Sequence, residues 1–397
     1  MPRLVADRPV LHTTSELGRV MHAARAREAA GERVLHLERG EPDFDTPPHI
    51  VEALARAARD GATHYPHERG EVALREAIVA KLARENGIAA HVDDVTITAG
   101  GTHALFRAVQ GVLSPGEELL VFSPHWMAVP KMVGFAHGVG YRTLPVYLEL
   151  QAGRWTPAQF ADHVRAALRP ETRAIYLNTP NNPTGVVLSR AYLEALAGVC
   201  LERDLVVLSD EAYEHLVYDG ATHTSIASLP GMAERTLSIF SYSKSYAMTG
   251  WRVGYVVAPP ELRPVMVPLL AFYSTHGVFP AAQHAALAAT TGPQDAVQAM
   301  RAAYDQRRTL LLDGLAATSR VTVARPTGAF YVFANVAPVR GSRTLWELVD
   351  EWLTLGVASL PGTAFGPEHG DWVRLALCTR ADDVAEAARR IARHAGA

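Results

Sequence analysis

The chain has 397 residues and a formal net charge of -3, with no basic block or tail, so it lacks the charge pattern of a protein that binds nucleic acid non-specifically. Hydrophobic residues make up 48% and charged residues 20%, which is typical of a globular protein large enough for more than one structural unit. The two cysteines, Cys200 and Cys378, stand outside any CxxC pattern, and no apolar run reaches membrane-spanning length, so we expect a cytoplasmic protein without a disulfide framework, a metal site or a membrane partner.

Apolar runs alternate with amphipathic stretches from about residue 50 to residue 290. Six runs have the character of strands: 95–100, 118–124, 173–180, 205–213, 236–243 and 252–259. Amphipathic stretches such as 104–113 and 190–204 lie between them. Doubly apolar strands separated by helices predict an α/β unit, in which a mostly parallel sheet has helices on both faces.

The pattern changes near Gln294, where a long helical stretch begins. Two shorter strands follow at 329–336 and 372–377, and a last helix begins at Ala381. This order predicts a smaller α+β unit. We therefore expect three parts: an N-terminal segment, 1–45, that joins the small domain; a large domain, 46–292; and a small C-terminal domain, 293–397.

The loops after five predicted strands are polar, glycine-rich or aromatic. They read GGTHA (100–104), SPHW (123–126), TPNNPTG (179–185), SDEAY (209–213) and SYSK (241–244). In open α/β sheets, ligands bind beyond the carboxyl ends of the strands. The five loops therefore predict one site at one rim of the sheet.

Lys244 stands alone among small hydroxyl and aromatic residues in SYSKSYAMTGWRVGY. Partial burial or a nearby positive charge, here Arg252, lowers the pKa of a lysine and makes its amine a nucleophile. Such an amine forms a Schiff base with a carbonyl substrate or with pyridoxal phosphate. The alternative is a solvated loop lysine.

Two further side chains fit that chemistry. Asp210 directly follows an apolar strand, so it is either a turn aspartate or the carboxylate partner of a pyridinium nitrogen. Tyr213 comes three residues later and reaches the same ring.

A phosphate site is suggested by AGGTHALF, a junction of strand, glycine and helix. Backbone amides at a helix start bind phosphate, although a tight turn at Gly101 explains the glycines equally well. Ser241, Ser243 and Arg252 would add donors.

Three more residues each have two possible interpretations. Trp126 is either a core residue or a ring that stacks on a planar ligand. Asn182 either caps a helix or bonds a ring hydroxyl. Arg374 interrupts an alternating strand and either pairs with a structural acid or clamps a substrate carboxylate.

Taken together, the motifs resemble the fold-type I pyridoxal-phosphate enzymes, and more narrowly the class I and II aminotransferases of the bacterial aspartate aminotransferase branch. The resemblance runs from about Gly40 to Arg374. It is carried by GEPDFDTP (40–47), GGTHA (100–104), PNNPTG (180–185), SDEAYEHLVY (209–218), SKSYAMTGWRVGY (243–255), PTGAFYVF (326–333) and LPGTAFG (360–366).

The resemblance implies a pyridoxal 5'-phosphate cofactor and a role for each matching residue. Lys244 would bind the cofactor covalently and move a proton between the substrate Cα and the cofactor C4′. The other implied ring contacts are Asp210 to the nitrogen, Tyr213 and Asn182 to the 3′-oxygen, and Trp126 by stacking. The implied phosphate ligands are Gly101, Thr102, Ser241 and Arg252, with Tyr65 supplied by the neighbouring subunit. The implied ligands of the substrate α-carboxylate are Arg374, Gly40 and Asn182.

A tyrosine shared across subunits implies a homodimer with joint active sites, acting on amino acids and 2-oxo acids in a ping-pong reaction. The scaffold also hosts β-elimination, decarboxylation and oxidation, so these stay open as alternatives, and a non-catalytic cofactor-binding regulator is a third.

The sequence departs from the aspartate-specific pattern at Thr102, where much of that branch has a lysine that helps to bind the acidic side chain. Arg19 or an arginine of the second subunit would have to replace that charge. An unpaired buried carboxylate costs several kcal/mol, so we expect aspartate to be a poor donor. The candidates for the pocket wall are Phe272, Tyr273, His276 and Phe279, and a cluster of His67, His103, His125 and His276 near the site would indicate altered specificity.

Overall fold

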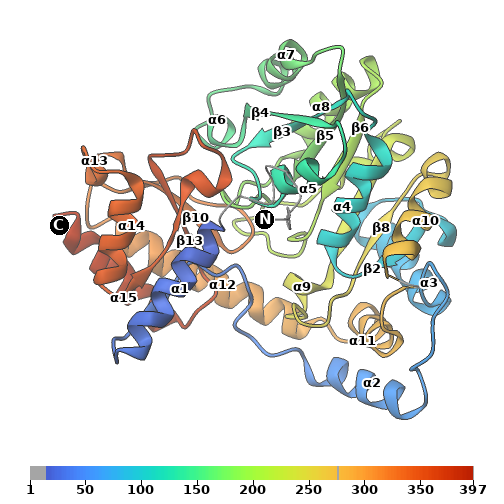
Figure 1. The fold of residues 1–397 in the computed structure, drawn as a ribbon, viewed down its shortest axis with the longest axis horizontal. Helices are drawn as coiled ribbons and strands as arrows, with labels where there is room; N and C mark the ends of the chain where they lie inside the picture. The colour runs from blue at the N-terminus through green and yellow to red at the C-terminus, as the bar shows by residue number, and fades with distance from the viewer. Residues whose placement is uncertain (1–14, 275–276, 397) are drawn as a thin grey trace, which may run out of the picture.

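The computed structural model describes residues 15–274 and 277–396, in which the strands form three sheets, of seven, four and two strands (Figure 1). In these residues, seven strands form the large sheet in the order β2-β8-β7-β6-β5-β3-β4. They are β2 (Val95–Thr98), β3 (Glu118–Ser123), β4 (Gly140–Pro145), β5 (Thr172–Asn178), β6 (Val206–Asp210), β7 (Thr236–Ser241) and β8 (Gly254–Val257). Only β8 runs against its neighbours, because it pairs antiparallel with both β2 and β7. The predicted α/β fold with a mostly parallel sheet is confirmed.

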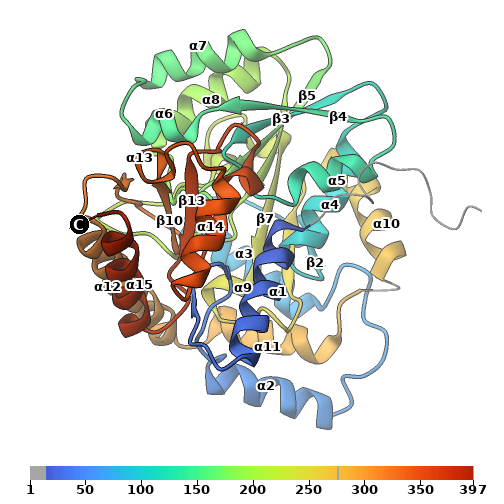
Figure 2. The same cartoon turned by 60° about the vertical axis from the view of Figure 1, so that its left-hand side comes forward.

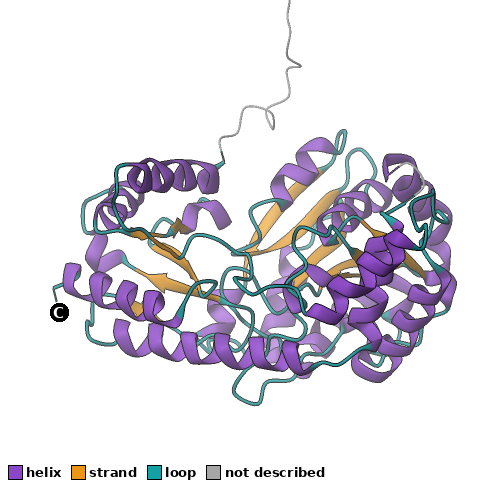
Figure 3. Ribbon diagram, turned by 90° about the horizontal axis from the view of Figure 1, so that it is seen from below, coloured by secondary structure: helices purple, strands orange, loops and turns teal. Residues whose placement is uncertain are grey.

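Helices cover both faces of this sheet, as Figure 3 shows. They are α2 (Pro48–Arg59), α3 (Val72–Lys81), α4 (Gly101–Val112), α5 (Val129–Phe135), α6 (Tyr147–Gln151), α7 (Pro157–Ala167), α8 (Arg190–Glu202), α9 (Tyr242–Ser245), α10 (Arg263–Ser274) and α11 (Pro280–Thr291). Side chains alternate along β5, so Tyr176 packs in the core on the α4 side while Ile175 packs in the core on the α7 and α8 side. This double burial explains the continuous apolar runs of the strand sequences.

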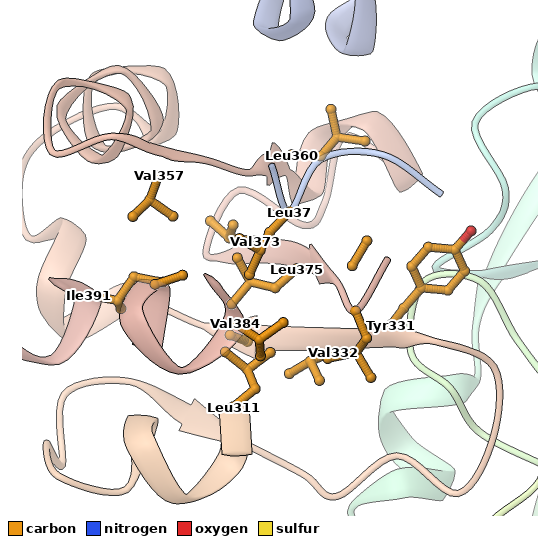
Figure 4. Packing of buried hydrophobic residues seen from close by; sticks show 14 of the residues in the cluster. Leu37, Leu311, Tyr331, Val332, Val357, Leu360, Val373, Leu375, Val384 and Ile391 are labelled. Atoms are coloured by element: carbon orange, nitrogen blue, oxygen red, sulfur yellow. The ribbon is translucent and has the colours of Figure 1, made fainter. Parts of the chain in front are cut away.

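A second, smaller unit surrounds a sheet of four strands in the described chain, in the order β12-β13-β10-β9. Its strands are β9 (Thr322–Val323), β10 (Tyr331–Asn335), β12 (Leu360–Pro361) and β13 (Trp372–Ala376), and its helices are α12 (Asp295–Leu315), α13 (Ala337–Arg340), α14 (Leu345–Thr354) and α15 (Ala381–His394). A capping box between Thr344 and Glu347 starts α14. Figure 4 shows the core of this unit, where Leu311 lies beside Val384; both belong to the buried cluster that includes Val373 of the sheet.

The N-terminal segment packs on this small unit. Its strand β1 (Leu35–His36) pairs in parallel with β11 (Val357–Ala358), and Leu37 is buried in the same core. Its helix α1 (Glu16–Ala29) lies beside α14 in Figure 2, and the Arg19 guanidinium donates to Asp350 at 2.9 Å. The domain boundaries near residues 45 and 292 stay a prediction.

Strand β4 was not predicted from the sequence. It is the edge of the large sheet next to β3, and its residues are exposed or half-buried. An edge strand of this kind has no apolar run to reveal it. None of the helices in the described ranges is both long and apolar enough to cross a membrane.

Candidate active site

The polar strand ends of the large sheet meet the small unit at a cavity of about 230 Å³. Of the residues predicted from the sequence, it is lined by Gly40, Gly101, Thr102, Trp126, Asn182, Asp210, Tyr213, Ser241, Ser243, Lys244, Arg252 and Arg374. The strand ends of the large sheet supply most of these residues, as expected for an open α/β sheet, and the small unit adds Arg374.

Lys244 follows β7 in the single-turn helix α9. Its Nζ donates a hydrogen bond to the Gly40 carbonyl oxygen at 2.8 Å. Burial lowers the pKa of the Lys244 amine, and the charges of Arg374 and Arg252 act in the same direction. The sequence has only two other lysines, Lys81 and Lys131, and neither lines the cavity among the described residues. Lys81 is instead buried in an ion pair with Glu214 at 2.5 Å.

Asp210 ends β6 and presents its carboxylate to the same cavity. Its Oδ2 accepts a hydrogen bond from the Tyr176 hydroxyl at 2.9 Å, and its Oδ1 accepts one from the Ala212 amide at 3.3 Å. Burial raises the pKa of the carboxyl to about 6, although both hydrogen bonds oppose that rise. At neutral pH, Asp210 is therefore a largely ionised carboxylate suited to a positively charged partner.

The start of α4 and the loop before β8 form the third corner of the site. Gly100 has a φ of 81° and precedes the helix, and the backbone is so close here that a Cβ on Gly254 would lie 2.8 Å from the Gly101 nitrogen. Arg252 holds a left-handed φ of 54° and donates to the Thr249 carbonyl oxygen at 2.6 Å. Amides of a helix start beside an arginine are suited to bind an anion.

Arg374 lies on β13, opposite this corner, and is 2% exposed. It donates to the Glu38 carbonyl oxygen and, at 3.4 Å, to Asn182 Oδ1. Its buried Nε has no hydrogen-bond partner and, within the described residues, no carboxylate pairs with it. The reading of Arg374 as the partner of a structural acid is therefore wrong, and the guanidinium keeps capacity for an anion.

Several lining residues were not predicted: Leu17, Met127, Asn178, Ala212, Thr249 and Tyr331. The Tyr331 hydroxyl lies 2.9 Å from that of Tyr213, and its ring lies 4.5 Å below the Arg374 guanidinium. Tyr331 sits inside the PTGAFYVF motif, which marked the region but not the residue. Leu17 gave no signal, because α1 reaches the cavity only through its packing on the small unit.

Tyr65 lies outside the cavity, 76% exposed, in an open hollow of about 640 Å³ between α2 and α11. Its expected role in a neighbouring subunit stays a prediction. Arg19 packs against α14, where its guanidinium lies 3.8 Å from the Trp346 ring, so it does not supply the charge missing at Thr102.

The histidines whose clustering would indicate altered specificity do not gather at the cavity within the described residues. His67 is exposed, and neither His103 nor His125 lines the cavity, while His276 lies outside the described residues. His103 Nδ1 accepts from the Ala99 amide at 3.2 Å, and burial lowers the pKa of its ring to about 4. His103 therefore has a local structural role.

Two of the four candidates for the pocket wall do not line the cavity of a single chain. Phe272 and Phe279 are 80% and 52% exposed and do not line it. The expectation rested on the position of this segment in the resemblance, which does not show where a side chain points. The Tyr273 side chain, like His276, lies outside the described residues.

Comparison with known proteins agrees with this geometry. The sequence profile of the family described as aminotransferase class I and II matches residues 32–391. The chain is 39% identical to an aspartate aminotransferase of Geobacillus stearothermophilus over 98% of each chain. It is 40% identical to an arginine–pyruvate transaminase of Pseudomonas aeruginosa, covering 94% of this chain and 93% of that one. The structure of a Thermus thermophilus aspartate aminotransferase with maleate superposes with a TM-score of 0.91 at 37% identity, covering 99% of this chain and all of that one. The chain belongs to the class I and II aminotransferases and is an enzyme of amino-group transfer.

Proposed function

We propose that the enzyme transfers the amino group of a neutral L-amino acid to a 2-oxo acid, with pyridoxal 5'-phosphate held at Lys244. The observation that carries the proposal is the meeting, in one cavity, of a lysine with a lowered pKa, an ionised carboxylate and an arginine with a free buried Nε. These three groups complement the aldehyde and ring nitrogen of the cofactor and the carboxylate of an amino acid.

The residues of the cavity fit the cofactor part by part. Asp210 would hold a protonated ring nitrogen, and the Trp126 ring would cover one face of the pyridine. Tyr213 and Asn182 would bond the ring oxygen. The phosphate would take the amides at Gly101 and Thr102, where backbone packing leaves no room for a larger residue at Gly254, together with the donors of Ser241 and Arg252.

When bound, the cofactor supplies an aldehyde for the amino group and a ring that withdraws electrons from the substrate Cα. Lys244 provides the amine and, once displaced, takes and returns the Cα proton as a general base. Its lowered pKa favours this, because a neutral amine accepts a proton and an ammonium group does not. Arg374, with Asn182 and the backbone at Gly40, binds the α-carboxylate and so orients the Cα–H bond.

The side-chain part of the cavity favours a neutral donor. Thr102 carries no charge, and the unpredicted lining residues Leu17 and Met127 are apolar. The cations that line the cavity are Lys244, Arg252 and Arg374, all three engaged by the cofactor or the α-carboxylate in this proposal. A substrate with an acidic side chain would bury an unpaired charge, so aspartate is expected to be a poor donor.

The proposal includes a homodimer in the cytoplasm, in which Tyr65 reaches the phosphate of the partner's cofactor. The exposed tyrosine and the open hollow around it are consistent with a covering subunit.

The test is to mix the purified, cofactor-loaded enzyme with single amino acids and follow the absorbance of the cofactor without an acceptor. A stable shift to the pyridoxamine form, reversed by a 2-oxo acid, supports the ping-pong reaction. Release of pyruvate, sulfide or peroxide without an acceptor would instead show elimination or oxidation. A protein that binds no cofactor at Lys244 would overturn the proposal.

A further inference from the structure

A buried tyrosine in the core of the large sheet touches the site from behind. Tyr176 lies on β5 and is 1% exposed. The parallel register pairs Tyr176 with Leu208 and Asn178 with Asp210, so Tyr176 stands one same-face position before Asp210. Its long side chain spans that step, and its hydroxyl donates to Asp210 Oδ2 at 2.9 Å.

The acceptor distinguishes Tyr176 from other buried tyrosines of the chain. Tyr147 and Tyr218 donate to backbone carbonyl oxygens, at 2.8 Å and 2.6 Å. A bond of Tyr176 to a carboxylate is charge-assisted and stronger than those. Burial and the Asp210 charge raise the pKa of the Tyr176 hydroxyl well above its ordinary value, so the hydroxyl is a donor at neutral pH.

The bond acts on one oxygen of the carboxylate. With Oδ2 fixed by Tyr176 and Oδ1 by the Ala212 amide, the Asp210 side chain has one orientation. A donor to the ionised form also counteracts the burial that favours protonation. We propose that Tyr176 is a positioning residue that fixes Asp210 and keeps it ionised toward the ring nitrogen of the bound cofactor. This inference rests on the proposed function.

The test compares Tyr176→Phe with Tyr218→Phe, which removes an equally buried hydroxyl away from the cavity. In the loaded enzyme, the pH midpoint of the visible absorbance of the lysine-bound cofactor is measured. A weaker hold on the ring proton leaves less positive charge near the lysine nitrogen, so the midpoint should rise by about half a unit or more in Tyr176→Phe. Turnover should fall on the order of tenfold for every amino acid, with KM little changed. Tyr218→Phe should change neither quantity.

A second measurement tests whether Tyr176 acts through Asp210. In the Asp210→Asn background, Tyr176→Phe should have no further effect on the midpoint or on turnover, because the ionised acceptor is gone. An unshifted midpoint in Tyr176→Phe, an equal shift in Tyr218→Phe, or an undiminished effect in the Asp210→Asn background would each overturn the inference. A wild-type enzyme without the lysine-bound absorbance would overturn the proposed function itself, which keeps the two failures distinct.

Discussion

Lys244 can be tested as the covalent attachment point because the chain offers so few alternatives. Besides Lys244 the sequence contains Lys81, which is held in an ion pair, and Lys131, which does not line the cavity of the described chain. Lys244→Ala should remain folded, lose the absorbance of the lysine-bound cofactor and lose at least about a thousandfold in turnover, because attachment and proton transfer use one amine. Lys131→Ala is the matched control and should keep both. A normal absorbance band in Lys244→Ala would move the attachment to another lysine.

The Asp210 carboxylate should lower the stability of the folded protein at neutral pH while it supports turnover. Its pKa of about 6 in the folded protein exceeds the value of about 3.9 for an exposed aspartate, so the folded state binds more protons between these values. Stability of the cofactor-free protein is therefore lost as pH rises through this window. Asp210→Asn should raise the free energy of unfolding at pH 7 by on the order of 2 kcal/mol, with little gain near pH 4.

The same variant should lose turnover roughly a hundredfold or more while retaining the cofactor, since an amide cannot hold the ring nitrogen protonated. Denaturant melts at the two pH values and steady-state kinetics check both parts. Normal turnover without a gain in stability would make Asp210 a turn residue only.

Arg374 should affect all substrates alike. Arg374→Ala removes a charge-assisted clamp worth roughly 1.5–3 kcal/mol, so KM should rise about ten- to a hundredfold for every amino acid and oxo acid. Arg374→Lys retains the charge without the planar fork and should be intermediate. An effect confined to one substrate class would contradict binding to the shared α-carboxylate.

At the scale of elements, helix α1 packs on the small unit and supplies a residue to the part of the cavity that we expect to receive the substrate side chain. The Thr363 hydroxyl donates to Glu16 at 2.9 Å beside Leu17, which lines the cavity. Leu17→Ala should lower kcat/KM about tenfold for phenylalanine and methionine, because apolar contact with the substrate side chain is lost. Alanine, which is too short to reach Leu17, serves as the internal control. Equal losses for all three amino acids would indicate a general role of α1 and not contact with the side chain.

The elements that the sequence revealed are those with a local signal. The doubly buried strands and the polar residues at their ends can be recognised from neighbouring residues in the sequence. Lys244 and Asp210 could be predicted for this reason. Strand β4 is half-exposed, and Leu17 reaches the cavity through tertiary packing, so no local pattern marks either of them. The position of a histidine next to a loop in the sequence likewise does not show whether its side chain enters the cavity, and His103 and His125 do not line it.

At the scale of the whole molecule, the proposed dimer can be tested by mixing two inactive variants. Lys244→Ala and Tyr65→Ala subunits would form mixed dimers in which one site joins an intact Lys244 to an intact Tyr65. Random exchange makes half of the dimers mixed and restores one site in each, so activity should recover to roughly a quarter of wild type. Each variant alone, treated identically, is the control. Recovery no greater than the sum of the controls would exclude a shared site.

The backbone carbonyls of Glu38 and Gly40 determine which hydrogen bonds must be displaced when the site is occupied. They accept hydrogen bonds from Arg374, the proposed ligand of the substrate carboxylate, and from Lys244, the proposed attachment point of the cofactor. The acceptor of the Arg374 hydrogen bond at Glu38 is an uncharged carbonyl oxygen, so an incoming carboxylate displaces a neutral ligand instead of breaking an ion pair. The resting site thus carries no built-in inhibitor. An engineered aspartate facing Arg374 would be such an inhibitor, because its carboxylate would compete with the substrate carboxylate for Arg374.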